Sequence, residues 1–294
     1  MIHFGRPSKP SARGSTRGSH AWFWTRLQRP ALAAVLTLLA LAILAIGAPW
    51  IAPRDPNSTD LRGALEAPGA GGHTLGSDEL GRDILSRVIY GSRASLATGL
   101  VVVGIAGTLG VALGAIGGYW GGIVDALIMR CADVLMAFPF LVLAIAAVAI
   151  TGPGLFQMMV VLGAVTWTGY ARLTRSLVLI MRRMAYVQAA LAVGAGEGRI
   201  LWRHILPNCL GVLIVQATFG VATSMLAASG LSYLGMGAQP PMAEWGAMLS
   251  TAQPYLRQRP LMSIAPGVAI MLSTVIVNFA GDAFRDVLDP RSRA

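Results

Sequence analysis

Long uncharged stretches alternate with short charged segments along the chain. Because a helix needs about 20 apolar residues to cross about 30 Å of hydrocarbon, each such stretch predicts a membrane span. The 38 uncharged residues between Asp133 and Arg172 are too many for one helix, and the turn sequence Thr151-Gly152-Pro153-Gly154 divides them. The pattern therefore predicts six spans, centred on residues 30–52, 95–118, 134–151, 155–171, 209–229 and 260–281.

The composition supports a membrane protein. Only 12% of the residues are charged, 55% are hydrophobic, and the mean hydropathy is +0.63. A soluble domain of this size needs about twice as many charged residues to cover its surface, and a disordered chain has far less apolar content. The two cysteines, Cys131 and Cys209, have neither disulfide-framework nor zinc-site spacing. We therefore expect an all-α, polytopic integral membrane protein without a metal site.

Basic residues lie unevenly about these spans. With the N-terminus inside, the inner segments contain 16 of the 23 basic and six of the 13 acidic residues, and the outer segments contain seven of each. Cytoplasmic loops carry the excess of Lys and Arg, so we expect both termini on the cytoplasmic side of the membrane. Orientation alone explains the net charge of +10, so no nucleic-acid partner is expected.

The spans also define the expected organisation of the chain. The first apolar run is longer than the 7–15 residues of a signal-peptide core, so it predicts an uncleaved anchor. The expected parts are a disordered basic tail (1–29), a first span (30–52), an outer loop (53–93), a five-helix core (94–285) and a second tail (286–294).

The outer loop contains a candidate helix. Ser77 is a suitable N-cap, and Asp78–Arg82 and Asp83–Arg87 are i,i+4 pairs. With an apolar stripe on its other face, this segment predicts an interfacial helix on the outer face of the bilayer, with surface ion pairs and no catalytic role.

The inner loop, residues 172–208, is too long for a plain turn. A small-residue helix around Gln188–Ala192 is expected to end at the glycine-rich corner 194–198, and a second short helix, 199–205, is expected to stop before Pro207. Such a compact, small-residue hairpin fits a groove on another protein. The alternative is an amphipathic hairpin without a partner.

These residues resemble the EAA-type motif of binding-protein-dependent ABC importer permeases. Four further segments, LGSDELGRDILSRVIYGSRASL, GYWGGIVDALIMRCADVLMAFP, LSYLGMGAQPP and NFAGDAFRDVLDPR, resemble the dipeptide/oligopeptide permease subfamily. Gln188 stands where the family often has glutamate, Leu191 where it often has arginine, and Ser77 where it often has threonine. The resemblance implies a type I permease fold and an ATPase-coupling role for Gln188, Ala189, Ala190, Gly194, Ala195, Glu197, Ile200, His204, Pro207 and Asn208.

The resemblance also implies partners. It implies a half-channel that forms a heterodimer with a second permease subunit in the lipid bilayer of a bacterial inner membrane. It also implies two ATP-binding subunits and an extracytoplasmic substrate-binding protein. Independently, the single lysine, Lys9, lies in Ser-Lys-Pro rather than in a P-loop, so no nucleotide site is expected in this chain. The chain is then not itself an enzyme and holds no cofactor, and ATP and Mg²⁺ are bound by the partner ATPase subunits.

Three other features have a structural and a functional interpretation. His204 has no second ligand at metal-site spacing, which favours a structural hydrogen bond. Asp133 beside Arg130 is either a proton relay or, more simply, a structural ion pair near the inner boundary. Glycines at three- and four-residue spacing indicate close packing of the second span against an intra- or inter-subunit neighbour: Gly107, Gly110, Gly114 and Gly118.

The expected substrates are dipeptides or oligopeptides, as the resemblance implies, with another small solute such as nickel or glutathione as the alternative. A secondary transporter is less favoured because neither inverted repeats nor an intramembrane acid site is evident. Uncharged polar residues at membrane depth are the candidates for lining a pathway: Gln216, Thr218, Ser273, Thr274 and Asn278.

Overall fold

The fold is a bundle of long helices. The computed structural model describes the backbone of residues 17–288 and the side chains of residues 32–287, and the described part contains no β-strand. The elements are α1 (Arg17–Ile46), α2 (Ala48–Ile51), η1 (Leu61–Gly63), η2 (Ala70–Gly72), α3 (Ile84–Trp120), α4 (Gly122–Met136), α5 (Phe140–Thr151), α6 (Leu155–Met181), α7 (Ala185–Ala192), α8 (Glu197–Arg199), η3 (Ile200–Ile205), α9 (Leu206–Tyr233), α10 (Trp245–Ala252), η4 (Gln253–Tyr255) and α11 (Leu261–Leu288).

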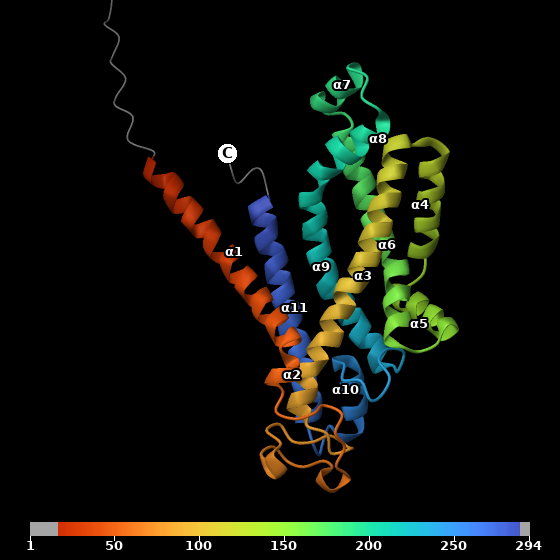
Figure 1. Cartoon of the computed structure of the whole chain (residues 1–294). Coiled ribbons are helices and arrows are strands. Elements are labelled where there is room, and N and C mark those ends of the chain that lie inside the picture. The colour runs from red at the N-terminus through yellow and green to blue at the C-terminus, as the bar shows by residue number, and fades with distance from the viewer. Residues whose placement is uncertain (1–16, 289–294) are drawn as a thin grey trace, which may run out of the picture.

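The long helices extend between two non-equivalent ends (Figure 1). α7 and α8 lie beyond one end of the bundle, and the irregular segment 52–83 lies at the other, below α2 and the start of α3. α1 begins at Arg17, so the helix includes residues 17–29 that the sequence assigned to a tail. The remainder of the expected tails, 1–16 and 289–294, lies outside the described residues.

Three helices of the described part are long and apolar enough to cross a membrane: Ile84–Trp120, the continuous helix Glu197–Tyr233, and Leu261–Val287. A fourth span results if α4 and α5, which meet at 93°, are counted as one broken span. α6 has the length but is less apolar, because it contains Gln157 and several hydroxyl and aromatic residues before Arg172. Within the residues whose side chains are described, α1 contributes the shorter apolar helix Leu32–Ile46. By length and composition alone, three or four spans are found.

α3 and α6 pack closely through glycine. A Cβ on Gly110 would lie 2.4 Å from the Trp167 carbonyl oxygen, and one on Gly114 would lie 2.3 Å from the Ala171 carbonyl oxygen. Gly107, one turn earlier on α3, has open space instead. The neighbour of this glycine stripe is therefore α6 of the same chain, and Gly107 is not part of the contact.

The 52–83 segment is held by buried charges, which differs from the surface pairs expected. Arg82 Nε donates to Asp78 Oδ2 at 2.6 Å, and its Nη2 donates to Glu79 Oε1 at 3.0 Å. The side chains of Arg82 and Asp78 are only 4% and 7% exposed. Burial raises the pKa of Glu79. This segment therefore has a polar core of its own.

The helix after this segment begins at Ile84, so the expected N-cap at Ser77 is wrong. Asp83 is the cap: its Oδ2 accepts from the Ser86 backbone N–H at 2.8 Å and from the Ser86 hydroxyl at 2.6 Å. Asp83 Oδ1 lies 3.0 Å from His73 Nδ1 rather than against Arg87. Burial acts to raise the pKa of Asp83, but the bonds from Ser86 and His73 outweigh it and lower that pKa. Residues 84–93 are thus the first turns of α3 and not a separate interfacial helix.

Two other helix boundaries differ from the expected ones. The charged stretch 122–136 forms α4, although it was expected to be an inner loop preceding a span at 134–151. The expected stop before Pro207 is also wrong, since π-helical η3 leads directly into α9. Proline lacks an N–H, and the first turn of an α-helix after a wider π turn does not need that donor. The hairpin and α9 therefore form one continuous helix.

Candidate functional site

The inner-loop motif forms a hairpin at one end of the bundle. We call residues 185–205, which comprise α7, the glycine corner, α8 and η3, the α7–α8 hairpin. Figure 1 shows it projecting past the ends of α3, α6 and α9.

The hairpin reverses direction at Gly194. Its φ is +80°, and the N–H groups of Gly194 and Ala195 bond to the Leu191 and Ala190 carbonyls at 3.0 and 3.1 Å, the pattern of a Schellman motif. A Cβ at Gly194 would meet no atom within 4 Å. Glycine is therefore required by the left-handed backbone and not by a close contact.

The inner side of the hairpin is anchored in an apolar cluster. Val187, Ile200, Leu201 and Ile205 are fully buried and pack with residues near the ends of α3, α6 and α9, including Tyr119, Val178, Leu206 and Cys209. Ala190 and Ala195 are half-buried and pack on the same cluster. This packing fixes the hairpin to three long helices.

Hydrogen bonds complete the attachment. Gln188 Nε2 donates to the Arg182 carbonyl oxygen at 2.8 Å, a bond that a glutamate in its place would not donate. Trp120 Nε1 donates to Glu197 Oε2 at 3.0 Å, which joins the end of α3 to α8. Asn208 Nδ2 donates to the His204 backbone oxygen at 2.6 Å, so the bond found at His204 involves its main chain.

The outer side of the hairpin exposes apolar side chains. Val193 is 83% exposed, Trp202 56%, Tyr186 43% and Leu191 38%. Gln188 and Ala189 are also exposed on α7. The ten candidate residues therefore divide into an anchoring set that faces the bundle, among them Ile200 and Ala195, and an exposed set that leaves room for a partner. An exposed apolar surface on a rigid support is typical of a protein-interaction site.

The five candidate pathway residues lie on two packed helices, α9 and α11, and do not converge on one cavity. Gln216 is exposed, Ser273 is buried, and the buried Thr274 hydroxyl has no hydrogen-bond partner. Thr218 lines an apolar groove of about 680 Å³ between α1, α3, α9 and α11, and its hydroxyl donates to the Ile214 carbonyl at 2.9 Å. Asn278 on α11 is half-buried.

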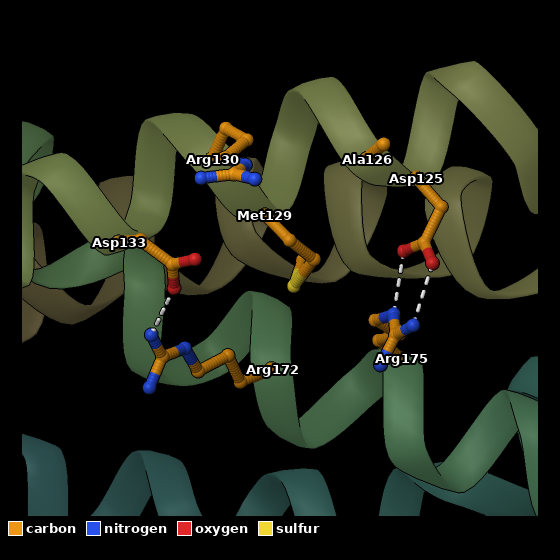
Figure 2. A pocket seen from close by; sticks show the side chains of 7 residues that line it. All are labelled: Asp125, Ala126, Met129, Arg130, Asp133, Arg172 and Arg175. Carbon is orange, nitrogen blue, oxygen red and sulfur yellow. Dashed lines mark hydrogen bonds and ion pairs between the residues drawn. The ribbon is translucent and has the colours of Figure 1, made fainter.

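Sequence reasoning missed a charged pocket of about 480 Å³ between α4 and α6, which we call the α4–α6 pocket. Arg175 holds Asp125 in a two-point pair, with both contacts at 2.5 Å, and Arg172 Nη2 lies 2.5 Å from Asp133 Oδ1 (Figure 2). The expected Asp133–Arg130 pair is therefore wrong: Asp133 bonds across to α6. The residues that line the α4–α6 pocket are Asp125, Ala126, Met129, Arg130, Asp133, Arg172 and Arg175.

Among the described residues, no three His, Cys, Asp or Glu side chains come together in a way that could hold a metal ion. Cys131 is exposed and Cys209 is buried, and both are free.

Comparisons with known proteins agree on one family. The profile for "Binding-protein-dependent transport system inner membrane component" matches residues 110–294, and that for "N-terminal TM domain of oligopeptide transport permease C" matches residues 17–68.

Relatives cover most of the chain. It is 44% identical to a protein of Escherichia coli K12 described as a probable D,D-dipeptide transport system permease, over 88% of this chain and 86% of that protein. It is 41% identical to a di/tripeptide transport system permease of Pseudomonas aeruginosa (92% and 91%) and to a glutathione transport system permease of Pectobacterium atrosepticum (92% and 91%).

Among solved structures, the chain is similar to a chain of the MetNI methionine ABC transporter in an inward-facing conformation. The TM-score is 0.57 at 18% identity, over 70% of this chain and 98% of that chain. This likeness concerns the fold alone, and it confirms the expected all-helical type I permease architecture.

Proposed function

Because the chain belongs to the family of binding-protein-dependent transport system inner membrane components, we propose that it is one of two permease subunits of an ABC importer for short peptides. The relatives reported above are named for D,D-dipeptide, di/tripeptide and glutathione transport, and all three substrates are short peptides. A peptide substrate therefore fits this group of relatives better than nickel or another unrelated solute.

The proposal includes six membrane spans, namely α1, α3, the broken pair α4–α5, α6, α9 and α11. The distribution of basic residues supports a cytoplasmic location for both termini and for the α7–α8 hairpin. The 52–83 segment then lies on the outer face of the inner membrane, where an external substrate-binding protein would dock.

The remaining proposed partners are a second permease subunit, which makes a heterodimer, and two ATPase subunits that bind ATP and Mg²⁺. We propose that the α7–α8 hairpin docks on one ATPase subunit and transmits its movement to the spans. One observation carries this assignment: the hairpin exposes apolar side chains outward while its inner side is fully buried against three long helices.

The coupling role is tested by Val193→Glu. Val193 is 83% exposed in this chain, so the substitution leaves the fold nearly unchanged apart from a carboxylate near a helix C-terminus, which costs at most about 1 kcal/mol. At an apolar interface the same carboxylate loses its hydration, so ATPase binding should weaken at least about tenfold.

The measurement is co-purification of the ATPase subunits, followed by ATP hydrolysis stimulated by the loaded substrate-binding protein. Leu61→Glu, at a 72% exposed residue of the 52–83 segment on the opposite end of the bundle, is the matched control for co-purification and should retain the ATPase subunits as wild type does. Full ATPase binding and stimulated hydrolysis in Val193→Glu would remove the hairpin from the coupling interface.

A further inference from the structure

We infer that the α4–α6 pocket is a binding site on the translocation pathway for the charged termini of a short peptide. This inference rests on the proposed transport function and adds to it a place inside the membrane where the substrate is held. The site combines two carboxylates of α4 with two arginines of α6 and one arginine of α4: Asp125, Asp133, Arg172, Arg175 and Arg130.

The pocket extends to about the middle of the membrane. Ala132 packs with Trp167 in one apolar cluster, and the Trp167 carbonyl lies against Gly110 of α3. Gly110 is close to the centre of the uncharged part of α3, residues 94–120, which is about 40 Å long. Asp133, which follows Ala132, is therefore near the mid-membrane level, whereas Asp125 lies beside Gly117 near the end of α3.

The charges at that level are half exposed. The side chains of Asp133 and Arg172 are 56% and 44% exposed, although they pair with each other. Ionised groups inside a membrane face the bundle interior or a water-filled cavity, because hydrocarbon cannot solvate them. The pocket therefore opens to water in the assembled complex, as a pathway does.

The broken span gives a second, independent indication. α4 ends at Met136 and α5 begins at Phe140, and the two helices meet at 93° directly after Asp133. Non-helical backbone at membrane depth is tolerated only where protein or a water-filled cavity satisfies it, and broken helices commonly form transport sites. The pocket and the break lie on the same segment.

The mixture of charges selects the ligand. Arg130 lines the pocket but has no ion pair or hydrogen bond in the described part of the chain, and Figure 2 shows no bond to it. A peptide zwitterion supplies a carboxylate for Arg130 and an ammonium group for Asp133. An anionic lipid headgroup would satisfy Arg130 but would offer no cation to Asp133, so it would use only half of the site.

The dimensions agree with a short peptide. The part of α4 that lines the pocket runs from Asp125 to Asp133, a rise of about 12 Å, which bounds the length of the ligand. Arg130 and Asp133 are only about 4.5 Å apart in rise, so the long Arg130 side chain must extend along the pocket to meet the far terminus of the peptide. An extended dipeptide or tripeptide is about 7–10 Å long, and the pocket volume of about 480 Å³ is within the range for small ligands. Because Asp125 and Asp133 are already paired when the pocket is empty, binding exchanges partners and stays weak, which suits passage.

Thiol labelling tests the site directly. Ala126 is exposed and lines the pocket, so Ala126→Cys, with Cys131→Ser and the buried Cys209 retained, places a probe there. The complete importer is placed in lipid nanodiscs and treated with a charged, membrane-impermeant methanethiosulfonate. We expect rapid labelling, slowed severalfold by millimolar dialanine but not by N-acetyl-alanyl-alanine amide, which lacks both charges. Leu127→Cys, on the next residue, should label slowly with or without dialanine.

Arg130→Gln in the same background separates binding from structure. Since Arg130 has no partner, a merely structural pocket would be unaffected, whereas loss of the carboxylate contact should remove the dialanine protection. The same substitution should slow peptide transport about tenfold, and Arg285→Gln, at an exposed arginine near the end of α11, should not.

Three results would overturn the inference: an unlabelled pocket, labelling that dialanine does not slow, or protection that depends on phosphatidylglycerol in the nanodisc instead of on dialanine. The last result would assign the pocket to a lipid headgroup. The labelling requires neither ATP hydrolysis nor transport. If the wild-type importer moves peptides but the pocket gives one of these results, the proposed function stands and the pocket assignment falls.

Discussion

Replacing Gly110 with alanine should separate α3 from α6. The new Cβ would lie 2.4 Å from the Trp167 carbonyl oxygen and 2.5 Å from the Tyr170 Cβ. An ordinary contact begins at 3.4 Å, so one helix must move by about 1 Å along the α3–α6 interface. The nearest atoms belong to the backbone and to a Cβ, so no side-chain rotation relieves the contact. Overpacking of this kind costs about 1–3 kcal/mol.

Gly107→Ala is the matched control, because it makes the same chemical change on the same helix where nothing lies within 4 Å. Alanine is favoured over glycine inside a helix by about 1 kcal/mol, so Gly107→Ala should be neutral or stabilising. Gly110→Ala gains the same propensity, so this term cancels, and the two variants should differ by the overpacking cost, about 1–3 kcal/mol in the free energy of unfolding. Thermal unfolding of the purified importer, followed by tryptophan fluorescence, measures the difference. Equal transition temperatures for the two variants would refute the close-packing argument.

Two further predictions concern the 52–83 segment and the orientation of the chain. Arg82→Ala removes the partner of two carboxylates from a buried site, so it should destabilise that segment by about 3 kcal/mol and expose it to limited proteolysis. Arg62→Ala, at an exposed position, should not, and equal proteolysis rates for the two variants would contradict the buried pairing. In intact spheroplasts, an impermeant thiol reagent should label Asn57→Cys and not Ala192→Cys in a chain lacking Cys131, and the reverse pattern would invert the proposed topology.

The uncharged intervals predicted where most of the long helices lie, because hydrocarbon excludes isolated charges and the apolar runs are therefore long. The same reasoning failed for α4. Asp125 and Asp133 were taken as the limits of spans, yet both lie inside α4, where arginines of α6 pair with them. The amino-acid sequence alone does not show such pairing between residues of two different helices.

Local motifs were informative where one residue decides the conformation. Gly194 was expected at a corner, and its φ of +80° confirms a left-handed turn there. Ser77 was expected to be the cap and Asp83 is the cap found, because tertiary contacts decide between them. The Ser77 hydroxyl is bound within the 52–83 segment, while Asp83 also meets His73. Burial of the charges around Arg82 likewise depends on folding of the whole segment.

The π-helical turn before Pro207 has a mechanical consequence. Since η3 joins α8 to α9 without interruption, Glu197–Tyr233 is a single element of 37 residues, about 55 Å along its axis. For a helix of this length that turns as one body, each degree of rotation about one end displaces the other end by about 1 Å. The α4–α5 span, by contrast, is already divided at 93°, so a torque applied to one half need not turn the other. A small rotation at the hairpin would therefore move the continuous helix Glu197–Tyr233 relative to the divided α4–α5 pair inside the bundle.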